Sequence, residues 1–126
     1  MQDRPTAIEL LQSAQEFCER DLIPNLNGRV AFHARVLRNV LSILEREWEL
    51  EEDAIRAEHA RLRNLLDLKE TPPTLAALRA AVSDANTELS DEIRSGHMDD
   101  RLDEIAAVLA ETVREKLAIA NPRYAE

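Results

Sequence analysis

The sequence predicts an all-α fold, a helical bundle of about five helices, of which four are long and one is shorter. Only two glycines occur among the 126 residues, which leaves few positions suited to tight hairpin turns. Alanine, leucine, glutamate and arginine, all strong helix formers, dominate the composition. Apolar residues also recur at intervals of three and four, the spacing of a helix with one buried face.

The first predicted helix runs from about Ala7 to Leu22. The segment TAIE before and within its first turn matches a capping box, in which Thr6 and Glu9 each bind a backbone amide of the other. Pro24, in the segment IPNLNG, ends the helix because proline lacks an amide hydrogen and disfavours helical geometry in the residue before it.

The second predicted helix spans about Arg29 to Glu49 and carries the longest apolar pattern of the chain. At about 100° per residue its apolar positions cover roughly 200°, so we expect this helix to be central and to contact neighbours on more than one side. A shorter third helix is predicted from about Glu52 to Asp67. The segment ELEED between the two contains neither glycine nor proline, so the sequence leaves open whether the helix breaks near Leu50.

The last two predicted helices span about Leu75 to Arg94 and about Arg101 to Ala120. A linker with two prolines, KETPPT, precedes them, and SGHMDD separates them with a glycine stop followed by aspartates suited to capping. Pro122, in the tail NPRYAE, keeps the last helix from continuing. The length of the chain fits one domain, residues 1–126.

Composition also limits the function classes. The formal net charge of −9 repels a phosphate backbone and anionic lipid, so we expect neither nucleic-acid nor membrane binding. The sequence holds no apolar run of about 18 residues, and its start does not resemble a signal peptide. A single cysteine, Cys18, fits a reducing compartment. These features predict a cytoplasmic protein.

The sequence shows no recognisable catalytic, metal or cofactor motif. No histidine has a glutamate three residues before it, which excludes the usual ligand pair of a di-metal helical bundle. Two glycines are too few for a phosphate-binding loop. His59 and His97 lie in polar stretches and are predicted to be exposed, whereas Cys18 faces the core. We therefore expect no cofactor, and a non-enzyme more readily than an enzyme.

One polar group stands out at the junction of the first two predicted helices. His33 lies near the middle of the apolar arc of the second helix, one turn after Arg29, and Asp21 lies in the apolar stripe of the first helix. A buried charge needs a partner, so we expect these three residues to meet as a buried polar latch, with His33 in the core. The alternative is an anion-binding or proton-transferring pocket made by the same residues, to which Tyr124 of the tail contributes.

Three arginines on the opposite side of the second helix, Arg35, Arg38 and Arg46, are predicted to be solvated. Residues 29–46 contain four arginines and one glutamate, a local basic patch on an acidic protein. The patch is either a solvated face or a docking surface for an acidic partner. Trp48 shares the line of the apolar positions, so we expect it to pack at least partly against another helix.

The chain resembles a bacterial domain family of unknown function. The resemblance rests on four segments in order: DRPTAIELL, GRVAFHARVLRNVL, IRSGHMDDR and KLAIANPRY. Members of that family are commonly found beside, or fused to, kinase-like proteins that resemble aminoglycoside phosphotransferases, and near acyl-CoA dehydrogenase-like genes. The resemblance implies an accessory role near acyl-CoA or phosphoryl-transfer metabolism and supplies no catalytic residues.

These observations favour a non-catalytic accessory or interaction module that associates with a phosphotransferase-like small-molecule kinase or an acyl-CoA metabolic enzyme. One alternative is a small-molecule (anion) binding protein, or a small enzyme, that uses an Arg29/His33/Asp21 pocket. Another is a homodimeric bundle whose apolar face is buried against a second copy. Polar side chains that point into an open cleft would favour the binder, whereas paired and covered ones would favour the module.

Overall fold

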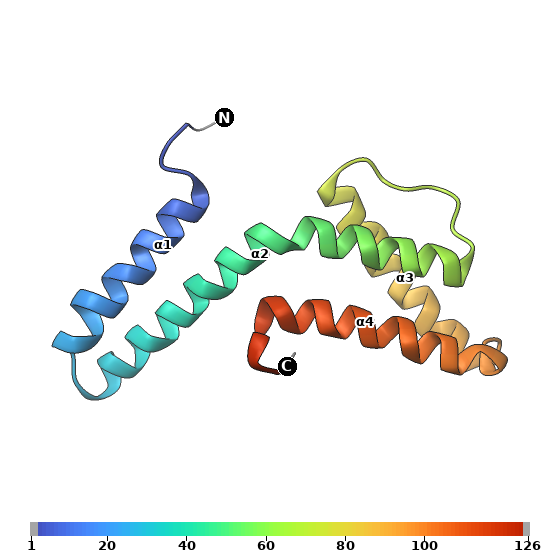
Figure 1. Ribbon diagram of the computed structural model, residues 1–126. Helices are drawn as coiled ribbons and strands as arrows, with labels where there is room; N and C mark the ends of the chain where they lie inside the picture. The colour runs from blue at the N-terminus through green and yellow to red at the C-terminus, as the bar shows by residue number, and fades with distance from the viewer. Residues whose placement is uncertain (1–2, 125–126) are drawn as a thin grey trace.

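Helix α2 organises the fold, because every other helix packs against it or follows directly from one that does. In the computed structural model, which describes residues 3–124, α2 runs without interruption from Gly28 to Leu66, a length of 39 residues. Helix α1 (Ala7–Phe17) lies along the first half of α2, and helices α3 (Leu75–Ser95) and α4 (Leu102–Ala120) lie along its second half (Figure 1). The all-α bundle is confirmed.

The number of helices differs from the prediction, because the structure has no break near Leu50. The segments predicted as separate helices, 29–49 and 52–67, are one helix, so the described residues form four α-helices. Nothing between Arg29 and Leu66 interrupts the backbone hydrogen bonds, since this stretch contains neither glycine nor proline. Helix α2 ends only at Asp67, which adopts the left-handed conformation with a φ of 54°.

Helix α1 and residues 28–46 of α2 form a hairpin that we call the arm. The predicted capping box is present: Thr6 Oγ1 accepts from the backbone N–H of Glu9 at 3.2 Å, and Glu9 Oε2 accepts from that of Thr6 at 2.7 Å. A π-helical turn, Cys18–Leu22, and a 3₁₀ turn, Ile23–Asn25, then lead into α2. The connection is therefore helical almost throughout.

The arm is held together by small buried residues and by polar contacts. Ala31 and Ala34 of α2 are buried, and their small side chains let α1 approach closely. Glu45 of α2 accepts hydrogen bonds from Gln12 Nε2 at 2.6 Å and Gln15 Nε2 at 2.7 Å, and these bonds lower the pKa of the Glu45 carboxyl. Glu45 is therefore partly buried against α1.

Trp48 lies at the edge of the contact between α1 and α2. It borders a groove with Leu10 and Leu11 of α1, yet 70% of its surface is exposed. Helix α1 therefore covers only a minor part of the Trp48 side chain.

The main cluster of buried apolar residues lies in the other half of the molecule. Its buried residues come from the second half of α2, from α3, from α4 and from the loop between α3 and α4: Leu62, Leu65, Val82, Ala85, Leu89, Met98 and Ile105. The arm contributes no residue to this cluster. The molecule thus consists of a well-packed three-helix end and a thinly packed arm that share one helix.

A buried carboxylate joins the three helices of the core end. Glu58 of α2 is 5% exposed and accepts hydrogen bonds from Asn86 Nδ2 of α3 at 2.9 Å and from Lys116 Nζ of α4 at 3.1 Å. Its neighbour His59, predicted to be exposed, is buried with 2% of its surface accessible. Both residues have apolar neighbours one turn away on α2, so this buried face of the helix contains polar as well as apolar side chains.

Replacing Lys116 with alanine should lower the free energy of unfolding by about 1–2 kcal/mol, because a buried carboxylate would keep Asn86 as its one protein donor. The estimate is at the low end because the Lys116 side chain is 62% exposed and water can replace part of its contact. Urea unfolding measures the change. Lys69→Ala, which removes an exposed lysine of the linker, is the control, and an equal loss in both variants would contradict this role of Glu58.

A second contact between helices predicts a pH dependence. Arg79 of α3 binds Glu51 of α2 through two hydrogen bonds, Nε–Oε1 at 2.6 Å and Nη2–Oε2 at 2.5 Å, and these lower the pKa of Glu51 below 4.5. The lowered pKa means that the folded protein binds the proton less readily than the unfolded chain does. The stabilisation is therefore present above the ordinary carboxyl pKa and is lost as the pH falls through the lower, folded-state value.

Glu51→Gln should accordingly reduce the free energy of unfolding at neutral pH, and the difference from the parent should shrink as the pH is lowered below about 4.5. Urea unfolding across this pH range tests the expectation. Glu49→Gln serves as the control, because Glu49 forms no ion pair or hydrogen bond through its side chain within residues 3–124. A difference for Glu51→Gln that did not change with pH would refute the assignment.

Candidate functional site

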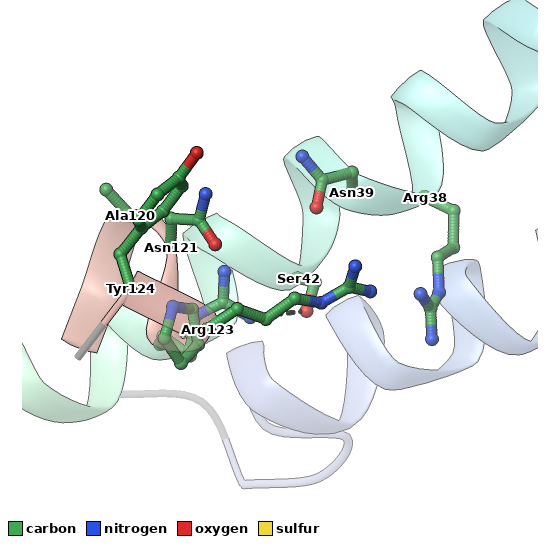
Figure 2. Close-up of a pocket in the computed structure, with 9 residues that line it drawn as sticks. Arg38, Asn39, Ser42, Ala120, Asn121, Arg123 and Tyr124 are labelled. Carbon is green, nitrogen blue, oxygen red and sulfur yellow. Dashed lines mark hydrogen bonds between the residues drawn. The ribbon is translucent and has the colours of Figure 1, made fainter. Parts of the chain in front are cut away.

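An open cleft of about 550 Å³ lies between α2 and the C-terminal 3₁₀ turn η4 (Pro122–Tyr124) (Figure 2). Its lining residues come from the two elements and the end of α4: Arg38, Asn39, Ser42, Arg46, Ala120, Asn121, Pro122, Arg123 and Tyr124. Three of them are arginines and none is an aspartate or glutamate. The lining therefore carries a formal charge of +3 on a chain whose net charge is −9.

Helix α2 supplies one wall of the cleft. Arg38, Ser42 and Arg46 follow one another at intervals of four residues and so lie on the same side of the helix. Arg46 Nη1 donates to Ser42 Oγ at 2.8 Å, and Arg46 Nε donates to the carbonyl oxygen of Ile119 in α4 at 2.7 Å. Arg46 thus fixes the end of α4 against α2, and the predicted exposure of Arg46 is wrong because this contact covers part of its side chain.

The C-terminal turn supplies the other wall. Pro122 cannot continue α4, and the chain instead forms a turn in which the backbone N–H of Tyr124 donates to the carbonyl of Asn121 at 3.0 Å. This turn sends the chain back toward α2. In Figure 2 the side chain of Arg123 extends from the turn toward Arg38 and crosses Ser42 in this view.

The three arginines differ in how they are bound. Arg38 Nη2 lies 2.5 Å from Glu19 Oε1 on the π-helical turn, and Arg46 is held by Ser42 and the end of α4. Arg123 forms no hydrogen bond or ion pair through its side chain within residues 3–124, although it lines the cleft. Its planar guanidinium is therefore available to donate two parallel hydrogen bonds to a phosphate or a carboxylate.

The chemistry of the lining suits binding better than proton transfer. The lining contains no histidine, cysteine, lysine or carboxylate, and arginine stays protonated at any physiological pH. Ser42 accepts from Arg46 and has no base beside it among the lining residues. The amides of Asn39 and Asn121 and the hydroxyl of Tyr124 add neutral donors around the arginines.

Three of the residues singled out from the sequence meet in this cleft. Tyr124, expected as a ligand-binding residue, lies there together with Arg38 and Arg46, which were expected as a partner-binding patch. Arg35, the third member of that patch, is exposed on α2 outside the cleft. The predicted patch is thus divided: two arginines line the cleft, and one faces solvent alone.

The predicted latch of Asp21, Arg29 and His33 does not form. Arg29 Nε donates to His33 Nε2 at 3.3 Å, but both residues are exposed, and Asp21 is exposed on the π-helical turn. The prediction of a core histidine is wrong because α1 packs on the side of α2 that carries Ala31, Ala34 and Glu45. The middle of the apolar arc, where His33 lies, is left uncovered. The alternative, an anion-binding or proton-transferring pocket made by these residues, stays a prediction.

Sequence reasoning missed Arg123 and the two cleft asparagines. Pro122 marks the end of the last helix, but no local pattern says in which direction the chain turns after it. Glu58 had a detectable signal, since it lies one turn from Ile55 and Leu62 in an apolar series. Two other expectations are confirmed: Cys18 is buried, with 2% of its surface accessible, and His97 is exposed.

No helix in residues 3–124 has both the length and the apolar character needed to cross a membrane. Within the same residues, no three side chains of histidine, cysteine, aspartate or glutamate are grouped so that they could hold a metal ion.

Comparison with known proteins gives one match. Residues 24–124 match the model of a domain of unknown function, DUF6285. All nine residues of the cleft fall inside the matched range, whereas α1 precedes it. Neither the curated proteins nor the solved structures contain a match to the chain.

Proposed function

The chain belongs to the DUF6285 family, whose description assigns no activity, and from the geometry of the site we propose that it is a non-catalytic accessory module that binds an anionic group in the arginine-lined cleft. One observation carries the proposal: three arginines and no carboxylate line a single open cleft of an otherwise acidic protein. Concentrated positive charge on such a surface attracts small anions and holds them by charge-assisted hydrogen bonds.

The anion is a phosphate or a carboxylate, because these are the groups that guanidinium donors bind in pairs. Arg123 supplies the unpaired donors, Arg46 adds a fixed positive charge, and Tyr124 and the asparagines add hydrogen bonds at the rim. Arg38 is shared with Glu19, so it is the weakest of the three contributors. Ligands of this class include the phosphate groups of coenzyme A thioesters and of phosphorylated small molecules.

This ligand class agrees with the accessory role that the resemblance implies. A module that serves a phosphotransferase-like kinase or an acyl-CoA enzyme meets phosphate groups on the substrates or products of its partner. The lining contains no histidine, cysteine, lysine or carboxylate, which supports a binding role in such an association. We therefore propose that the cleft retains or presents an anionic metabolite, and that a kinase-like or acyl-CoA-metabolising protein is the partner.

Titration calorimetry with inorganic phosphate, coenzyme A and acetate tests the binding and distinguishes the two anions. Arg123→Ala should weaken binding of the favoured anion about tenfold to a hundredfold, the loss expected for a charge-assisted pair of hydrogen bonds. Arg35→Ala is the matched control, because it removes the same charge from α2 outside the cleft. Equal effects of the two substitutions, or no binding of any of the three anions, would contradict the proposal.

A further inference from the structure

We propose that two copies of this chain associate through the uncovered apolar face of the arm, with their α2 helices antiparallel, so that two arms form a four-helix bundle. The face consists of Val30, His33, Leu37, Val40 and Leu44. All five are exposed. It lies on a different side of α2 from the arginine-lined cleft, so the inference does not depend on the proposed function.

The arm carries far more exposed apolar surface than the rest of the molecule. Eight of the thirteen large apolar residues that are exposed within residues 3–124 belong to the arm, and Trp48 and Leu50 directly follow it on α2. The arm itself buries only Ala31 and Ala34, and Cys18 is buried in the turn that connects its two helices. An exposed apolar patch of this extent on a soluble protein marks an interaction surface.

The spacing of the face is that of a helix that pairs with another helix. Its five residues follow one another at intervals of three, four, three and four, which is the heptad spacing of a coiled-coil seam. Four of the five are aliphatic, and His33 is the single polar member. Pairing along this seam explains why a histidine lies in the middle of an apolar arc and yet is exposed in the single chain.

Farther along α2, the side that carries these five residues is covered by other helices. At about 100° per residue, Val40 and Glu58 lie on the same side of α2. At Glu58 that side is covered by α3 and α4, through Asn86 and Lys116, and the five exposed residues of the face lie ahead of that point on α2. Ahead of that point, no element within residues 3–124 buries the seam. A helix of a second copy would therefore extend a packing surface that α4 leaves incomplete.

The charges near the two ends of the seam favour a second copy of the chain as the partner that covers it. Arg29 and Glu47 are 18 residues apart, five full turns, so they lie on the same side of α2 near the two ends of the seam. Neither forms an ion pair within residues 3–124. A two-fold axis between Leu37 and Val40 brings Arg29 against Glu47 of the partner subunit, and the contact occurs twice. Parallel pairing would instead place equal charges together.

Sedimentation equilibrium of the full chain tests the association. The parent should be a dimer at micromolar concentration, and Leu37→Glu/Val40→Glu should be a monomer whose helical circular dichroism is retained. Val113→Glu is the control, since Val113 is 53% exposed on α4 and lies outside the arm. A monomeric parent, or a Val113→Glu variant that dissociates as fully as the arm variant, would overturn the proposal.

Charge reversal tests the antiparallel arrangement. It also tests the dimer itself if Leu37→Glu/Val40→Glu does not fold. Arg29→Glu and Glu47→Arg should each weaken the dimer about tenfold, because each sets like charges against each other at both ends of the seam. The double variant, Arg29→Glu/Glu47→Arg, should recover the dissociation constant of the parent. Single variants that dimerise like the parent, or a double variant weaker than both singles, would overturn the pairing.

Discussion

The continuity of α2 is the constraint on which the rest of the structure depends. One helix of 39 residues carries α1 at one end and α3 and α4 at the other, and the core cluster reaches only the latter. A break near Leu50 would let the two ends fold back on each other and share a core. Because the helix does not break, the arm extends beyond the core and keeps its apolar face uncovered.

The same constraint positions the cleft. Helix α4 is shorter than α2 and packs along its second half, so α4 ends beside the middle of α2, where Arg46 holds the carbonyl of Ile119. The turn after Pro122 then carries Arg123 and Tyr124 over a stretch of α2 that belongs to the arm. The anion site therefore lies at the junction of the two parts. The cleft and the seam use side chains from the same few turns of α2.

The sequence predicted the fold class and most helix ends, because these depend on local signals such as the capping box at Thr6, the prolines of the linker and the glycine at Gly96. It predicted that His33 lies in the middle of an apolar arc, but burial also requires a neighbour, and the periodicity of one helix does not say which side its neighbour takes. The cleft could not be predicted from the sequence for the same reason. Arg123 and Arg38 are 85 positions apart, and only the packing of α4 on α2 brings them together.

The most direct test of this account is a distance measurement along α2. Spin labels at Arg35→Cys and Asn64→Cys, in a chain with Cys18→Ala and diluted with unlabelled protein, report the intramolecular separation by double electron–electron resonance. These positions are 29 residues apart, which is about 43 Å along a straight helix, and the bend of α2 in Figure 1 shortens that length, so the account predicts one narrow distribution with its maximum a little below about 43 Å. Two helices meeting at a right angle near Leu50 would give about 31 Å. A maximum near that value, or a broad distribution, would contradict the account.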